Sequence, residues 1–186
     1  MSKYITIPLA RLSYPSLFTK KGFDESTPDD RKKYEATFLI EKSEKATIKK
    51  IKEAALKCAK DKWGKVPEKL VMSCLQDGSE KDDKDGYGDE VMFVPAAAKH
   101  RPQTVNRDKT PVTEEDNVLY AGCYVTGVIS LYAWTFKNRK GISANLDVVQ
   151  FRKDGEPFGA GKPDLDEVLP DLDDEDDDDM FGDEDE

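Results

Sequence analysis

Hydrophobic and polar residues alternate along several stretches of the chain, which is the pattern of half-buried β-strands. One stretch begins at Tyr4 and reads YITIPLARL, and a second, YEATFLIE, runs from Tyr34 to Glu41. In the second stretch one face carries Tyr34, Ala36, Phe38 and Ile40, and the other carries Glu35, Thr37, Leu39 and Glu41. Both stretches are therefore predicted to be strands with one face in a core.

A helix is predicted to follow the second strand. Its apolar residues recur at helical spacing and comprise Ile48, Ile51, Ala55 and Cys58. Ser43 is the expected N-cap, and Gly64 and Pro67 end the pattern. The opposite face is rich in lysine and is expected to be solvated.

The second half of the body also has the pattern of a β protein. A short strand is predicted at Val91–Val94, and longer strands at Leu119–Lys137 and Ile142–Phe151, joined by the turn KNRKG. A polar loop at 77–90 and a long irregular connection at 95–117 separate them. Five or more strands with one helix predict a small barrel or sandwich.

The charge of the chain is unevenly distributed. The whole sequence has 29 basic and 39 acidic residues, but 15 of the acids and no Lys or Arg lie in residues 164–186. Residues 1–163 therefore carry about +5 and the last segment −15. A run of carboxylates with so few apolar neighbours is expected to be a disordered acidic tail, and such asymmetry points to polyanion binding or its imitation.

The N-terminal segment lacks the layout of a signal peptide, and no apolar run approaches the length needed to cross a membrane. The three cysteines, Cys58, Cys74 and Cys123, are odd in number and widely spaced, which favours a reducing compartment. We therefore expect a cytoplasmic protein whose cysteines are small buried side chains.

Most enzymatic sites are disfavoured by the residues present. His100 is the single histidine, and the cysteines lack the CxxC spacing of a zinc site. KDDKDGYGDEVM has Lys81 and Met92 where a calcium loop needs acids, and GEPFGAGKP lacks the spacing of a phosphate loop. No cofactor or metal is expected. Carboxylate clusters that hold Mg²⁺ for nuclease chemistry remain an open alternative.

The segment LYAGCYVTGVISLYAWTFKNRK carries the most informative pattern. In a regular strand, one face would be the small apolar set Ala121, Cys123, Val125, Ile129, Leu131 and Ala133. The other face would be an aromatic strip made of Tyr120, Tyr124, Tyr132, Trp134 and Phe136, followed by Lys137, Arg139 and Lys140. Rings that stack on bases and cations that neutralise phosphates are typical of single-stranded nucleic-acid binding. Alternatively, the rings fill a core and Gly127 is a bulge that exchanges the two faces.

Several segments carry a resemblance to a known family: YPSLF, GYGDEVMFVPAAAKHRPQTVNRD, VLYAGCYVTGVISLYAW, KGISANLDVVQFRKDGEPFG and the acidic end. Together they resemble the phage single-stranded DNA-binding proteins once classed as a domain of unknown function, which are similar in plan to the replication single-strand binders of podophages. The resemblance covers essentially the whole chain. It implies a mostly-β, OB-fold-like five-stranded barrel with an inserted helix, sequence-independent binding of single-stranded DNA, no catalysis, and a tail that recruits replication or recombination proteins.

The combined interpretation assigns residues 1–163 to the DNA-binding domain and 164–186 to the tail. The stacking candidates are Tyr14, Phe18, Tyr87, Tyr124, Tyr132 and Trp134, and the phosphate-binding candidates are Lys99, Arg101, Arg107, Arg139 and Lys140. The partner-binding candidates in the tail are Asp176, Asp177, Asp178, Asp179, Met180 and Phe181. An alternative is an acidic-tailed protein that mimics DNA and binds a host nuclease or replication factor. The positive charge of the body disfavours it, since a mimic should be acidic throughout.

Overall fold

The structure, a computed structural model, describes residues 3–22 and 24–158. Its elements in chain order are β1 (Tyr4–Lys21), η1 (Asp29–Arg31), β2 (Lys33–Glu41), α1 (Lys45–Trp63), β3 (Leu70–Met72), β4 (Gln76–Asp77), η2 (Gly78–Lys81), β5 (Val91–Ala98), β6 (Gln103–Val105), η3 (Glu114–Asp116), β7 (Tyr124–Phe136) and β8 (Arg139–Lys153). The predicted acidic tail, with its partner-binding candidates, lies outside the described residues.

Five of these strands form a closed ring in the order β1–β2–β5–β8–β7. Four of the five junctions are antiparallel, and the ring is closed by a parallel contact of β5 with β8, where Ala96 pairs with Ala144. Closing a sheet in this way removes the unpaired edges of the five strands from solvent. The predicted mostly-β fold, a five-stranded barrel with one helix, is confirmed.

The interior of the barrel is built from the alternating apolar residues of its strands. Phe38, Val125 and Ile129 are completely buried, as their alternation predicted. Gly127 also points inward, because a Cβ there would lie 2.5 Å from Cε1 of Phe38. Gly127 thus makes room for a core ring, and the two faces of β7 are not exchanged. The irregularities beside it fall on the neighbouring strands: on β1 between the pairs Ile7–Gly127 and Ala10–Val125, and on β8, where Asp147 is the extra residue between the pairs Val128–Val148 and Ile129–Leu146.

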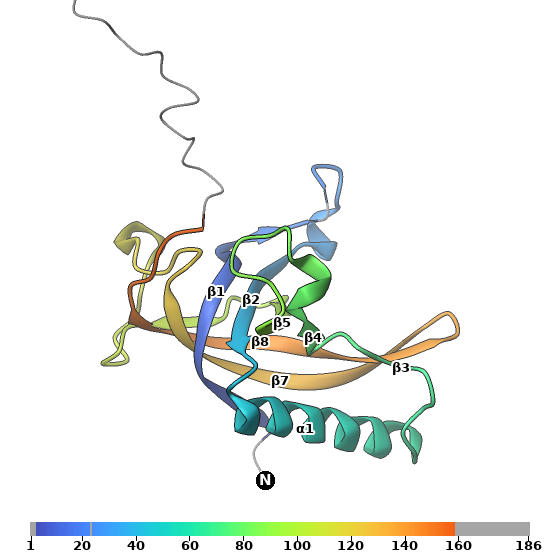
Figure 1. Cartoon of the computed structure of the whole chain (residues 1–186). Helices are drawn as coiled ribbons and strands as arrows, with labels where there is room; N and C mark the ends of the chain where they lie inside the picture. Colours follow the sequence, from blue (N-terminus) through green and yellow to red (C-terminus); the bar gives the residue numbers. More distant parts are fainter. Residues whose placement is uncertain (1–2, 23, 159–186) are drawn as a thin grey trace, which may run out of the picture.

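Helix α1 lies across one end of the barrel, and the β7–β8 hairpin projects to one side (Figure 1). Ile48, Ile51 and Ala55 are buried as predicted, whereas Cys58 is only half-buried. The helix ends at Gly64, which adopts φ 77° and donates its N–H to the carbonyl of Lys60 at 2.8 Å. The predicted N-cap was wrong by one residue: Glu44 is the N-cap, and the Ser43 hydroxyl donates to a Glu41 carboxylate oxygen at 3.3 Å.

Two boundaries differ from the sequence predictions because distant segments determine them. The connection at 95–117 is less irregular than predicted, since β5 continues to Ala98 and β6 pairs in parallel with β8. The strand predicted from Leu119 begins only at Tyr124. Just before it, Gly122 has φ 108°, and a Cβ there would lie 2.3 Å from the carbonyl oxygen of Glu156. The backbone of Glu156 and Pro157 packs against Gly122 here, just before β7 begins.

Arg11 of β1 holds the last described residues, Glu156 to Phe158, against the barrel. Its guanidinium Cζ lies 5.6 Å from the centre of the Tyr124 ring and 4.4 Å from that of Phe158. Arg11 also donates to the carbonyl oxygens of Gly122 and Glu156, at 3.0 and 2.5 Å. The described chain therefore ends at a defined place on the barrel surface.

Asp77 joins the loop after β4 to the end of β2. Its carboxylate accepts the backbone N–H of Ser79 at 2.9 Å and lies 3.0 Å from the ammonium of Lys42. These contacts, first the Ser79 N–H and then Lys42, lower the pKa of Asp77 to about 2. Because the folded pKa is below the unfolded value, the contribution to stability is complete above about pH 4 and is lost as the pH falls towards 2.

We therefore expect Asp77→Asn to lower the melting temperature at neutral pH, by an amount that shrinks between about pH 4 and pH 2. Thermal melts across this range measure the effect, with the exposed neighbour Asp82→Asn as the matched control. A constant difference between Asp77→Asn and the native chain down to pH 2 would contradict the assignment.

None of the helices in the described part of the chain is both long enough and apolar enough to cross a membrane. Within residues 3–22 and 24–158, no three His, Cys, Asp or Glu side chains gather as a metal site. All three cysteines are free thiols, of which Cys74 and Cys123 are buried. Burial raises the pKa of Cys74 to about 12.

Candidate nucleic-acid interface

Two adjoining hollows of about 560 and 330 Å³ form one groove over β5 and β8. Both are lined by Ala97 and Tyr132, so the groove is continuous. Its lining includes the small residues Ala96, Ala97 and Ala98 at the end of β5.

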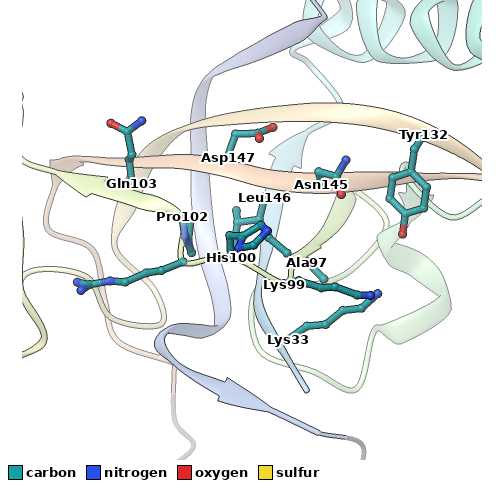
Figure 2. Close-up of a pocket in the computed structure, with 12 residues that line it drawn as sticks. Lys33, Ala97, Lys99, His100, Pro102, Gln103, Tyr132, Asn145, Leu146 and Asp147 are labelled. Atoms are coloured by element: carbon teal, nitrogen blue, oxygen red, sulfur yellow. The ribbon is translucent and has the colours of Figure 1, made fainter. Parts of the chain in front are cut away.

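Basic side chains gather along the larger hollow. Lys33 at the start of β2 and the exposed Lys99 and Arg101 after β5 line it, together with His100. Figure 2 shows Lys33 and Lys99 extending in the same direction, although they come from different parts of the sequence. No ion pair is recorded for Lys33, Lys99 or Arg101 in the described part of the chain. These cations are therefore available to a polyanion.

Arg101 is held against an aromatic ring beside the groove. Its guanidinium Cζ lies 5.0 Å from the centre of the Phe18 ring, a cation–π distance. Phe18 is itself half-buried and packs against the core. Phe18 therefore positions Arg101, while its ring face is already occupied by the guanidinium.

Tyr14 and Tyr132 are exposed rings that line the same smaller hollow. Tyr14 is 51% exposed and Tyr132 36% exposed. Tyr14 has φ 46°, an unusual conformation for a bulky residue, at an irregularity of β1 that precedes Pro15. Strained backbone of this kind is often found at binding sites, and here it directs a ring outward.

The ring of Tyr87 packs between those of Tyr14 and the buried Phe93. The Tyr14 and Tyr87 ring centres are 6.5 Å apart, and the Tyr87 ring meets Phe93 edge-on at 5.3 Å. The Tyr87 and Ser13 hydroxyls are hydrogen-bonded at 3.1 Å. Burial raises the pKa of Tyr87. Lys84 lies 5.6 Å from the Tyr14 ring centre and adds a cation at this end of the groove.

The aromatic strip continues from Tyr132 along the projecting hairpin. Trp134 donates its Nε1–H to the hydroxyl of Ser143 at 2.9 Å, and Ser143 lines the smaller hollow. The indole lies over Gly141, where a Cβ would be 2.2 Å from Cζ2. Arg139 and Lys140 follow at the hairpin, where the Lys140 ammonium lies 5.5 Å from the Trp63 ring centre. Trp134 and Arg139 lie on the same face of the hairpin as Tyr132, beyond the lining of the groove, whereas Lys140 pairs with Thr135 and lies on the opposite face, towards α1.

Two sequence candidates lie apart from the groove. Tyr124 is flanked by Arg11 and by Lys153, whose ammonium is 4.7 Å from the ring centre. Arg107 lies in the turn after β6, where its carbonyl accepts a hydrogen bond from Gln150 at 3.2 Å. The structure therefore brings together Tyr14, Tyr132, Lys99 and Arg101, with Tyr87 and Phe18 behind them, and separates Tyr124 and Arg107 from this set.

Sequence reasoning missed Lys33, Asn145 and Asp147, which also line the larger hollow. Asp147 is the bulged residue of β8, and its carboxylate accepts the Ser130 hydroxyl at 2.8 Å. Nothing in the local pattern around Lys33 indicates a binding role. The run Ala-Ala-Ala-Lys-His-Arg from Ala96 is the signal that could have indicated a shallow, basic surface.

The closed barrel, the helix across its end and the groove over β5 and β8 define an OB-fold protein. The family whose sequence profile matches residues 3–181 is described as the ssDNA-binding protein of Enterobacter phage Enc34. The chain belongs to this family, which confirms the resemblance seen in the sequence and makes it a binding protein rather than an enzyme.

Known relatives agree with this assignment. Protein p50 of Acyrthosiphon pisum secondary endosymbiont phage 1 is 36% identical over 160 residues, which cover 81% of this chain and 84% of p50. The single-stranded DNA-binding protein from bacteriophage Enc34, solved in complex with ssDNA, is 28% identical with a TM-score of 0.71, covering 84% of this chain and 90% of that one. The bacteriophage T7 protein gp2.5 is 13% identical with a TM-score of 0.51, covering 92% and 99%, and supports the fold alone.

Proposed function

We propose that this chain binds single-stranded DNA without sequence preference in the host cytoplasm, during phage DNA replication or recombination. The observation that carries the proposal is the continuous groove in which the exposed rings of Tyr14 and Tyr132 adjoin the cations Lys33, Lys99 and Arg101. Rings stack on any base and cations neutralise any phosphate, so neither contact depends on sequence. Membership of the Enc34 family supports the same function.

The residues of the groove would have three different roles: contact with phosphates, stacking on bases, and support of the contacting side chains. Lys33, Lys99 and Arg101 would follow the phosphates along the larger hollow, and Tyr14 and Tyr132 would each take a base in the smaller one. Phe18 and Tyr87 would hold Arg101 and Tyr14 in place. Trp134 and Arg139, on the same face as Tyr132, would extend the contact along the hairpin for a longer strand.

Fluorescence anisotropy tests the function with three labelled ligands of one length: oligo-dT, a mixed-sequence single strand and a duplex. We expect the two single strands to bind with similar Kd values and the duplex to bind more weakly. Equal or tighter binding of the duplex would contradict the proposal, as would binding of only one of the two single strands.

Tyr132→Ala should weaken binding of oligo-dT by about 1–3 kcal/mol and leave the melting temperature nearly unchanged, since the ring is exposed and contributes stacking. Tyr124→Ala is the matched control from the same strand. It should leave DNA affinity nearly unchanged and lower the melting temperature, because its ring packs with Arg11. If Tyr132→Ala instead destabilises the fold and spares binding, Tyr132 is a packing residue.

Removing divalent metal with EDTA should change neither the affinity for oligo-dT nor the melting temperature, because the proposed contacts use only rings and cations. Parallel titrations and melts with and without chelator measure both. A loss of binding in EDTA would favour the carboxylate–Mg²⁺ alternative.

We further propose that the acidic residues 164–186 compete with DNA for the groove and recruit replication or recombination proteins. A segment of charge −15 linked to a body of about +5 is present at high effective concentration. Asp176 to Asp179 with Met180 and Phe181 would supply the contacts to a basic partner surface, with the two apolar side chains as the anchor.

A further inference from the structure

A third hollow, of about 540 Å³, lies on the exposed side of α1, outside the groove proposed for DNA. Its floor is apolar and is formed by Ile48 and Leu56 of α1 and by Met92 of β5. Leu56 is 45% exposed, so its side chain is open to a ligand in this hollow. An apolar floor of this kind is suited to receive an apolar side chain.

The rim of this hollow is basic. Lys42, Lys45, Lys49 and Lys52 surround the floor, with Glu53 and Asp77 as the acids. Both acids are already paired: the Asp77 carboxylate forms an ion pair with the Lys42 ammonium at 3.0 Å, and the Glu53 carboxylate lies 3.8 Å from the Lys49 ammonium. Lys45 and Lys52 have no ion pair in the described part of the chain. The hollow therefore fits an acidic segment that carries an apolar anchor.

We propose that this hollow on α1 binds the C-terminal end of the same chain, with Met180 and Phe181 on the apolar floor. From Asp173 to Glu186 these two residues are the only large apolar ones. They follow Asp176–Asp179 and precede GDEDE, so acids flank the anchor on both sides as lysines flank the floor. The match of both charge and apolarity selects this segment as the occupant.

The length of the chain permits this contact. Phe158 and Met180 are 22 residues apart, and at about 3.3–3.6 Å per residue an extended chain covers at most about 70–80 Å. The α1 hollow and the DNA groove lie at opposite ends of β2, since Lys33 lines the groove and Lys42 the hollow. Because β2 has nine residues, its two ends are only about 30 Å apart, which is well within the reach of the extended chain. Met180 and Phe181 can therefore dock on α1 in the DNA-free protein while the acids between Asp164 and Glu175 remain within reach of the groove.

Photo-cross-linking in the full-length chain tests the docking site. Benzoylphenylalanine replaces Phe181, the DNA-free protein is irradiated at low salt, and cross-linked peptides are identified by mass spectrometry. We expect cross-links to residues 45–56 of α1 and to Met92. The double variant Lys45→Glu with Lys52→Glu should lower their yield about fivefold to tenfold, because two attractive charges become repulsive.

The matched control is Lys57→Glu with Lys60→Glu, which makes the same charge change on the same helix outside the hollow. It should leave the yield unchanged, and thermal melts verify that both double variants remain folded. Cross-links confined to the groove residues around Lys99 and Tyr132 would overturn the proposal, as would equal yields from the two double variants. DNA affinity plays no part in this readout, so its outcome is independent of the proposed function.

Discussion

A chain that ends at Lys162 should bind oligo-dT about tenfold or more tightly than the full-length protein at low salt. The physical reason is competition: removal of the remaining residues deletes 15 carboxylates that the basic groove would otherwise attract. The effect should shrink as salt rises, because screening weakens the attraction of the tail to the groove.

The place where the described chain ends favours such competition. Phe158 lies against Gly86, where a Cβ would be 2.4 Å from its ring. The next residue, Tyr87, has its ring 6.5 Å from that of Tyr14 in the groove. Phe158, the last residue that the structure describes, therefore lies close to the Tyr14 end of the proposed DNA site.

A full-length control separates the charge of the tail from its bulk. In this variant every Asp and Glu of residues 164–186 is replaced by Asn or Gln, which keeps the length and removes the charge. We expect it to bind DNA as tightly as the truncated chain. Equal affinity of the truncated and native chains at low salt would contradict the competition, and the tail would then act only as a partner contact or a solubility segment.

Raising the salt concentration from 50 to 200 mM should weaken binding of oligo-dT about 20- to 100-fold. This range follows from three to five neutralised phosphates, each contributing a slope of about −0.7 on a log–log plot for single strands. Under the proposal, Lys33, Lys99 and Arg101 would supply three of these contacts, and Arg139 of the hairpin and Lys84 beside Tyr14 would supply the others.

Two double variants, each replacing two cations by neutral glutamine, test which cations set the slope of this salt dependence. Lys99→Gln with Arg101→Gln should reduce the slope by about 1.4, whereas Lys57→Gln with Lys60→Gln on α1 should leave it unchanged. The chain truncated at Lys162 is the best background for both, since the tail is then absent. A slope near zero in that background would exclude phosphate neutralisation as the source of affinity.

The elements that the sequence predicted well are those set by local pattern. The alternation of β2 and the helical spacing from Ile48 to Ala55 each specify a buried face without reference to the rest of the chain. The end of β5 was missed because it is held by antiparallel pairing with β2 and parallel pairing with β8, and β6 was missed because it pairs with β8; all these partners are distant in sequence. Short strands held by such pairing leave little trace in local periodicity.

The type of site, exposed aromatic rings beside cations, was predictable from the sequence. Which of the candidate residues come together in it was not. Tyr124 and Tyr132 share one face of β7, and the local pattern contains no reason to separate them. The curvature of the barrel places Tyr132 in the groove and Tyr124 beside Arg11. Lys33 joins Lys99 and Arg101 only through the antiparallel pairing of β2 with β5.

The most direct test of the account is to locate a bound single strand on the barrel. An oligonucleotide carrying 5-iododeoxyuridine at single positions is bound to the full-length protein and irradiated, and the cross-linked residues are identified by mass spectrometry. The account predicts cross-links to Tyr14 and Tyr132. Cross-links confined to Tyr124, to α1 or to other surfaces away from β5 and β8 would contradict it.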